Sequence, residues 1–137
     1  MKKLIIQMFQ RIKVLMIFFL VLSCQSTDIY FDIKSQSIVS CNDRILKRLI
    51  IECDSLNPNN SDCVFDLSLK DKKTKDSRIE INEIVKLYRV KKKDTIFYPN
   101  NCYKITFIGS GDDGYTELKI WFDSYGKVYK TNKSNCN

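Results

Sequence analysis

The chain has 137 residues and a formal net charge of +7, from 23 lysine and arginine residues against 16 aspartate and glutamate residues. This length excludes an assembly of several ordinary domains. Because the chain contains no histidine, it lacks the side chain that most often acts as a general base near neutral pH. No other residue spacing points to a catalytic site, so we expect neither an enzyme nor a bound cofactor.

The first 23 residues have the pattern of an export signal. They carry four basic residues, Lys2, Lys3, Arg11 and Lys13, and no acidic one. Val14 to Leu22 is an unbroken apolar run. As a helix this run spans about 13 Å, against roughly 30 Å of bilayer hydrocarbon. It is therefore too short for a stable membrane span, and we interpret residues 1–23 as a signal peptide that is removed.

The apolar run ends in Val21-Leu22-Ser23-Cys24. These residues resemble the lipobox of bacterial lipoprotein precursors, in which an aliphatic, a tolerant and a small position precede an obligatory cysteine. The resemblance implies that Cys24 is lipidated, so that the protein contacts the membrane through this lipid. Residue 25 is Gln and not Asp, which in that family implies the outer membrane, with the domain facing the periplasm. The alternative is an ordinary secretory signal cut near Cys24.

Removal of the expected signal peptide lowers the net charge of the chain. The mature chain has 19 basic and 16 acidic residues, a net charge of +3. This small excess does not indicate a nucleic-acid partner. Residues 24–28 are expected to form a tether, and residues 29–137 one small domain.

Five cysteines remain after Cys24, namely Cys41, Cys53, Cys63, Cys102 and Cys136. Disulfides persist in exported domains, and an odd number leaves at least one thiol without an internal partner. The short polar loop between Cys53 and Cys63 predicts a disulfide between them. Among the others we favour Cys41 with Cys102, which leaves Cys136 unpaired. The wide spacings and the missing histidine do not suit zinc, so we expect no metal site.

Local patterns predict one helix early in the mature domain. Residues 29–33 are expected to form a first strand. Ser40 and Asp43 then resemble a capping box. Apolar residues follow at helical spacing on one face, namely Ile45, Leu46, Leu49, Ile50 and Cys53. This periodicity predicts an amphipathic helix that ends before the loop with Pro58.

The rest of the chain predicts strands and turns. Residues 63–69 alternate like a half-buried strand, and residues 70–76 are a charged, solvated loop. Residues 77–90 are ambiguous, and we interpret them as a turn or short helix near 78–84 that leads into a strand over 85–91. Further strands are expected at 95–98, 103–108, 115–122 and 127–131. The predicted fold is therefore α+β, with one N-terminal helix packed on an antiparallel meander.

Aromatic residues gather on the last hairpin. The strand face opposite Leu118, Ile120 and Phe122 carries Tyr115 and Trp121, and the adjoining hairpin carries Tyr125 and Tyr129. Exposed Trp and Tyr beside charged groups are typical of interfaces. We therefore predict that Trp121, Tyr115, Tyr125 and Tyr129 form a binding face. The alternative is that Trp121 packs beneath a loop.

Two classes of function are compatible with these features. The first is a non-catalytic binding domain, like an inhibitor or an immunity protein, which captures an envelope or secreted protein. The second is a passive structural component of the cell envelope with no dedicated ligand. The small size, the lipid anchor and the expected disulfides favour the first class.

Replacing Cys24 by Ser should abolish lipidation, because only the cysteine thiolate accepts the diacylglyceryl group. Cells that express the wild type and Cys24→Ser are labelled with a fatty-acid analogue and fractionated. We expect label and membrane association only in the wild type. A Cys24→Ser protein that is still labelled and membrane-bound contradicts the lipobox interpretation.

Overall fold

The structure, a computed structural model, describes residues 28–54, 63–71, 73–90, 95–109 and 116–136. The expected signal peptide, the lipidated Cys24 and Tyr115 lie outside these residues. What the sequence indicates about them stays a prediction.

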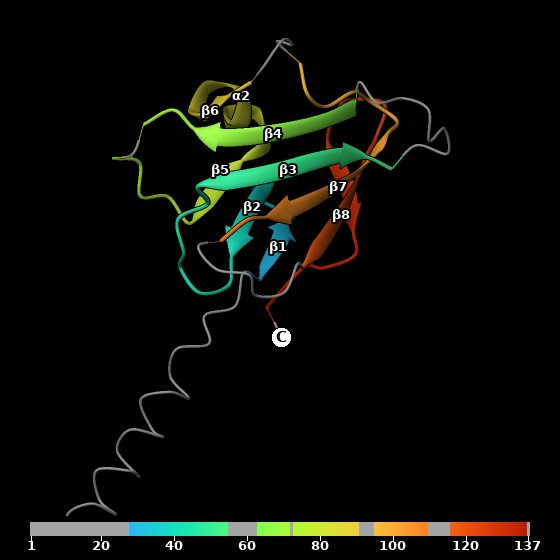
Figure 1. Cartoon of the computed structure of the whole chain (residues 1–137). Coiled ribbons are helices and arrows are strands. Elements are labelled where there is room, and N and C mark those ends of the chain that lie inside the picture. The colour runs from blue at the N-terminus through green and yellow to red at the C-terminus, as the bar shows by residue number, and fades with distance from the viewer. Residues whose placement is uncertain (1–27, 55–62, 72, 91–94, 110–115, 137) are drawn as a thin grey trace, which may run out of the picture.

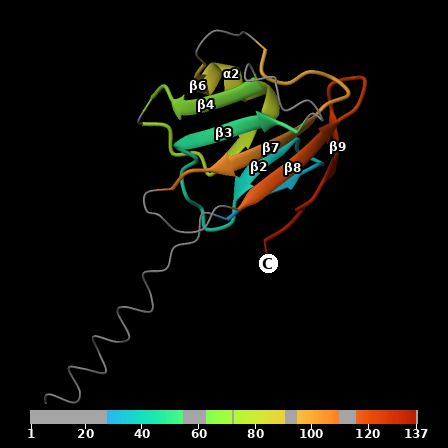
Figure 2. The same cartoon turned by 45° about the vertical axis from the view of Figure 1, so that its right-hand side comes forward.

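Two antiparallel sheets form the described part of the chain (Figures 1 and 2). The small sheet has the strand order β1 (Ile29–Asp32), β2 (Ser37–Ser40), β5 (Arg78–Glu80). The large sheet has the order β6 (Tyr88–Arg89), β4 (Val64–Leu69), β3 (Arg48–Cys53), β7 (Cys102–Phe107), β8 (Glu117–Phe122), β9 (Val128–Thr131). Between β5 and β6 the chain forms a 3-10 turn, η2 (Ile81–Glu83), and one short helix, α2 (Ile84–Leu87).

The core lies between the two sheets. Successive residues of a strand point to opposite faces, so Leu49 and Ile51 of β3 are buried while Arg48 on the same strand is exposed. The small sheet stacks on this inner face and contributes four fully or almost fully buried side chains, Ile29, Phe31, Ile38 and Ile79. Sheets packed in this way exclude water from both inner faces, and the fold is a β-sandwich.

The predicted N-terminal helix, and with it the α+β fold class, is wrong. Residues 48–53 form β3, near the centre of the large sheet. Ser40 Oγ does accept a backbone N–H of the following segment, that of Arg44 at 3.1 Å, although this N–H lies one residue beyond those that an N-cap accepts. However, Asp43 has a φ of 50°, which turns the chain out of a right-handed helix.

The physical reason for this error lies in the apolar run itself. Leu49, Ile51 and Cys53 also follow a period of two, which suits a strand. Ile50 and Ile51 are β-branched residues with a high strand preference. On a strand, pairing with β4 on one side and β7 on the other satisfies the backbone of this segment, and that pairing is not visible in the local pattern.

Other expected elements also differ from the structure. Residues 78–80 are a strand, and the short helix comes later and replaces the first part of the strand expected over 85–91. Residues 95–98 are not a strand, and β2 is a strand that the patterns did not predict. The large sheet is not a simple meander, because β3 pairs with β7 as well as with β4.

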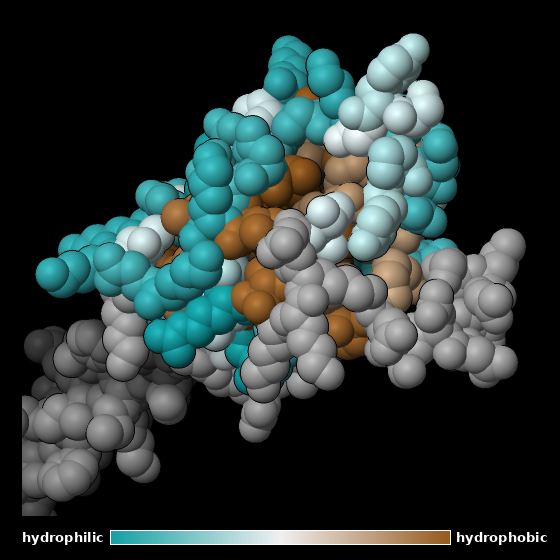
Figure 3. All heavy atoms as spheres, turned by 90° about the horizontal axis from the view of Figure 1, so that it is seen from above, coloured by the Kyte–Doolittle hydropathy of each residue, from teal (hydrophilic) through white to brown (hydrophobic). Residues whose placement is uncertain are grey.

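Buried Tyr88 joins the helical segment to the sandwich. Its side chain is fully buried and its hydroxyl donates a hydrogen bond to the Leu46 carbonyl. Burial raises the pKa of this phenol well above its ordinary value, so the hydroxyl stays a donor. Figure 3 looks down on the molecule from above, where apolar residues are framed by hydrophilic ones. Partly buried side chains of this region, among them Val85, Leu87 and Phe97, pack against the core.

The disulfides pair differently from one of our two expectations. Cys53 is bonded to Cys63 with a Cα–Cα distance of 5.4 Å. Cys41 is bonded to Cys136 with a Cα–Cα distance of 5.6 Å, so the expected pair of Cys41 with Cys102 is wrong and Cys102 is the free thiol. The wrong pairing has a structural reason, because the segment after β9 lies beside β1 and brings Cys136 close to Cys41. Phe31 N–H donates to the Lys133 carbonyl at 3.0 Å.

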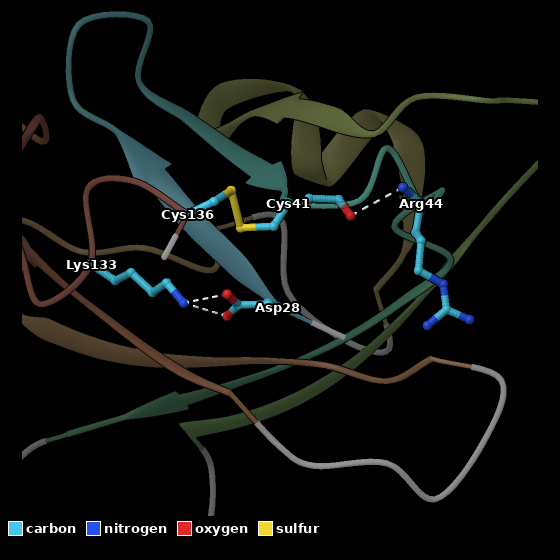
Figure 4. The surroundings of a disulfide bond; sticks show 6 residues. Asp28, Cys41, Arg44, Lys133 and Cys136 are labelled. Carbon is cyan, nitrogen blue, oxygen red and sulfur yellow. Dashed lines mark hydrogen bonds and ion pairs between the residues drawn. A yellow bond between two sulfur atoms is a disulfide. The ribbon is translucent and has the colours of Figure 1, made fainter. Parts of the chain in front are cut away.

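Both ends of the described chain meet at one end of the sandwich (Figure 4). The ammonium group of Lys133 binds both carboxylate oxygens of Asp28. Cys41 N–H donates to the Asp28 carbonyl at 3.0 Å, and Cys41 carries the bond to Cys136. We call this the anchor end, because Asp28 is the described residue nearest in sequence to Cys24, the predicted site of the lipid.

The two disulfides should contribute unequally to stability. The Cys41–Cys136 bond spans 95 residues and the Cys53–Cys63 bond spans 10, and a longer closed loop restricts the unfolded chain more. Loop entropy predicts that Cys136→Ser lowers the free energy of unfolding by about 4.5 kcal/mol and Cys63→Ser by about 3 kcal/mol. Chemical denaturation measures both, with Cys102→Ser as the control that breaks no bond. A greater loss for Cys63→Ser than for Cys136→Ser contradicts this ranking.

Candidate functional site

The outer face of the large sheet is the face that the small sheet leaves uncovered. On β8, the side chains of Leu118, Ile120 and Phe122 point to the inner face and are buried. The residues between them, Glu117, Lys119 and Trp121, are exposed or partly exposed. The alternation therefore places Trp121 on the outer face and not in the core.

Ion pairs neutralise most cations on this face. Lys104 Nζ lies 2.6 Å from Glu52 and 3.6 Å from Glu117, and Lys119 Nζ lies 3.0 Å from Asp54. The hydrogen bond that Lys104 donates to Glu52 raises the pKa of Lys104, and the one that Lys119 donates to Asp54 raises the pKa of Lys119. Each exposed pair of this kind adds only about 0–1 kcal/mol to the free energy of unfolding. Its main effect is that each lysine is already bound to a carboxylate of the same protein.

Arg48 and Asp66 form a similar pair nearer the β4 side of the same face. Arg48 Nε and Nη2 donate to the two oxygens of Asp66 at 2.8 and 2.6 Å. This two-bond geometry suits the planar guanidinium, and the contact with Asp66 raises the pKa of Arg48. A ligand that binds either charge has to compete with the Arg48–Asp66 pair.

A β-bulge gathers three side chains at the other side of the face. Trp121 is the register partner of Lys130 and Phe122 is the partner of Val128, so Tyr129 is the extra residue on β9. A bulge changes the normal alternation of a strand and redirects side chains. Tyr129 and Lys130 are consequently both exposed, and the Lys130 ammonium lies 4.7 Å from the centroid of the Trp121 ring. This distance is within the range of a cation–π interaction.

Beside these residues lies a hollow of about 540 Å³, which we call the Trp121 hollow. Trp121 and Tyr129 line it together with residues from three chain segments, namely Asp54, Asn100, Asn101, Cys102, Phe122, Asp123 and Ser124. The hollow therefore combines an aromatic wall with carboxylate, amide and hydroxyl groups. Such a mixture is typical of recognition sites, in which apolar contact area and a few polar groups act together.

Backbone hydrogen bonds hold the three segments of the hollow in place. Asp54 N–H donates to the Cys102 carbonyl at 2.9 Å, Phe122 N–H to Asn101 at 2.9 Å and Asn100 N–H to Asp123 at 3.1 Å. The turn that follows is closed by the Asp123 carboxylate, which accepts from the N–H groups of Tyr125 and Lys127 at 2.9 Å each. The hollow is thus built on a rigid frame.

Aromatic rings that pack against one another support this frame from the inner face of the sheet. Phe97 lies 5.0 Å from the ring centroids of both Tyr103 and Phe122. The Tyr103 hydroxyl accepts the Tyr98 N–H at 2.7 Å. These contacts connect the segment before β7 to the inner face of the sheet, so a ligand in the hollow would meet a surface that needs little ordering.

Cys102 places a free thiol at the hollow, with Sγ 3.9 Å from an Asp54 carboxylate oxygen. Burial, and then the charge of Asp54, raise the pKa of this thiol, while Lys119 lowers it to a lesser degree. The thiolate is the reactive form of cysteine. The arrangement therefore suppresses the nucleophilicity of Cys102.

The structure brings together some of the aromatic residues singled out above. Trp121 and Tyr129 line one hollow, whereas Tyr125, 88% exposed, lies in the turn between β8 and β9 and is not part of the lining. Their role in binding stays a prediction. Lys130 and Asp54 were missed, because only the bulge and the neighbouring strand β3 place them beside Trp121.

Comparisons with models of protein families, with curated proteins and with solved structures find no match. Within the described ranges, no three Cys, Asp or Glu side chains come close enough together to hold a metal ion. In the same part of the chain, no helix has the length and apolar character that crossing a bilayer requires.

Changing Asp54 to Asn should make Cys102 more reactive. The substitution removes a carboxylate that raises the thiol pKa, and it leaves the Lys119 cation to stabilise the thiolate. We expect alkylation of the folded protein by iodoacetamide to become faster near neutral pH, and its pH profile to move to lower pH. Asp66→Asn, a carboxylate on the same face away from the thiol, serves as the control. An unchanged profile in Asp54→Asn contradicts this electrostatic account.

Proposed function

We propose that this protein is a small lipoprotein, anchored in the cell envelope through Cys24, whose domain binds another protein and has no catalytic role. The anchor belongs to the outer membrane, with the domain in the periplasm, and the partner is an envelope or secreted protein. The observation that carries the proposal is the cluster of Trp121, Tyr129 and Lys130 beside a preformed hollow on the uncovered face of the large sheet.

The chemistry of this cluster favours a protein as the ligand. Trp and Tyr bury a large area with few rotatable bonds, so they lose little entropy on binding. Lys130 interacts with the Trp121 ring, whereas Lys104, Lys119 and Arg48 are paired with carboxylates. Lys130 is therefore the cation of this face that a partner's carboxylate reaches at the lowest cost.

The position of the hollow also supports the proposal. The chain from Cys24 enters the domain at Asp28, at the anchor end, whereas the hollow lies where β3 ends and β7 begins. In Figure 1 the coloured chain begins below the sheets, next to β1, whereas β3 ends on the right-hand side. The six residues of β3 alone span about 17–20 Å. The hollow thus does not lie at the point where the tether enters the domain, and a partner can reach it without displacing the tether.

Replacing Trp121 by Ala should weaken partner binding by roughly 2 kcal/mol, the loss expected for a central aromatic anchor. The mature domain is immobilised, partners are captured from an envelope extract, and the affinity of each identified protein is measured for both forms. The melting temperature should change little, because Trp121 is only partly buried.

The matched control is Val64→Ala, which truncates a 56% exposed apolar side chain on β4, separated from β8 by the two strands β3 and β7. We expect wild-type affinity for this variant. Equal affinity of Trp121→Ala and the wild type for every captured protein contradicts the binding face. A wild-type domain that captures no protein favours the passive envelope component.

A further inference from the structure

Hydrogen bonds connect two loops to the region where the chain enters the domain at Asp28. Cys41, which begins the loop over residues 41–47, donates its N–H to Asp28 at 3.0 Å. The loop over residues 70–77 is joined to the same region, because Ser40 N–H donates to Ser77 at 2.8 Å and Leu46 N–H donates to Asp76 at 3.3 Å. The loop over residues 41–47 and the last residues of the loop over 70–77 therefore lie next to the anchor end and its Cys41–Cys136 disulfide.

These two loops hold the whole positive excess of the mature chain. They contain six basic residues, Arg44, Lys47, Lys70, Lys72, Lys73 and Lys75, against three acidic ones, Asp43, Asp71 and Asp76. The rest of the mature chain has 13 basic and 13 acidic residues. Lys47, Lys73 and Lys75 are exposed. The net charge of the mature chain thus belongs to these two loops, and the rest of the mature chain is neutral as a net value.

A hollow at the end of β7 adds a second feature to this end. It has a volume of about 290 Å³ and is lined by the basic residues Arg44 and Lys47 and by the apolar residues Ile45, Phe107 and Ile108, with Asp43 and Gly109. Cations next to apolar groups match a phospholipid, in which a phosphate is joined to acyl chains.

We propose that the anchor end is a bilayer-facing surface whose two loops bind the headgroups of anionic phospholipids, with one headgroup in the hollow of Arg44 and Lys47. This inference rests on lipidation at Cys24, as proposed above. From Cys24 to Asp28 the chain reaches at most about 14 Å, so the anchor end stays next to the bilayer. At the high local concentration that a short tether imposes, even weak charge contacts are populated.

The consequence is a fixed orientation of the domain. With the anchor end held on the bilayer, the Trp121 hollow and the turn between β8 and β9 face away from it. A tether alone permits the domain to tumble, and part of the time the hollow would then be turned toward the lipid. The basic loops restrict this motion and keep the binding face available.

Hydrogen–deuterium exchange of the mature lipidated protein tests the proposal. The protein is reconstituted in vesicles of phosphatidylcholine alone and in vesicles in which part of this lipid is replaced by phosphatidylglycerol. We expect amide exchange in loops 41–47 and 70–77 to slow about threefold or more with phosphatidylglycerol, and the effect to disappear at high salt. Exchange in the turn over residues 123–127 should not change.

Two triple variants complete the test. Lys47→Gln, Lys73→Gln and Lys75→Gln together should remove the slowing. Lys34→Gln, Lys86→Gln and Lys127→Gln together take away the same charge at exposed positions in the turn after β1, in α2 and before β9, and should retain the slowing. Protein that floats with the vesicles but shows equal exchange in both lipids overturns the bilayer-facing surface alone. Protein that does not float with either vesicle overturns the lipid anchor and this inference with it.

Discussion

The inner face of the large sheet must be covered, and this requirement determines much of the architecture. Leu49, Ile51, Ile105 and Ile120 are fully buried there, and each such side chain contributes roughly 1.5–3 kcal/mol when it leaves water. The small sheet supplies the cover through residues such as Phe31 and Ile38. Because this cover comes from the N-terminal segment and from β5, the chain has to return to the same region several times.

The contact between the sheets also decides how the ends of the chain and the edge of the large sheet are held. Gln36, at the turn between β1 and β2, hydrogen-bonds the N–H and the carbonyl of Val128 at 2.8 and 2.9 Å. This amide occupies backbone groups that an edge strand would otherwise offer to another chain. The Cys41–Cys136 disulfide and the Asp28–Lys133 ion pair close the opposite end.

Because the small sheet covers only the inner face of the large sheet, the outer face of the large sheet stays accessible to a partner. On most of that face, ion pairs such as Arg48–Asp66 neutralise the charges locally. At one corner the β-bulge at Tyr129 breaks this pattern and places Lys130 over Trp121. The two proposed surfaces follow from this geometry. The binding face lies at one end of the strands, and the tethered, basic surface lies at the other.

The sequence by itself determined the features that depend on neighbours in the chain. The strands around Leu67, Ile105 and Ile120 follow from alternation, and so does the position of Trp121 on the face opposite Ile120, because the side-chain period of a strand is a local property. The Cys53–Cys63 bond follows from a short polar loop for the same reason. The resemblance to a lipobox likewise depends on adjacent residues, from Val21 to Cys24, and lipidation at Cys24 stays a prediction.

Only the tertiary structure decided features that depend on partners far away in the chain. The segment around Leu49 has both helical and strand periodicity, and pairing with β4 and β7 selects the strand. Cys41 meets Cys136 and not Cys102 because the segment after β9 lies beside β1. Asp54 and Trp121 line one hollow because β7 lies between β3 and β8. Strand order is set by the total area that the two sheets bury together, and no local pattern contains that information.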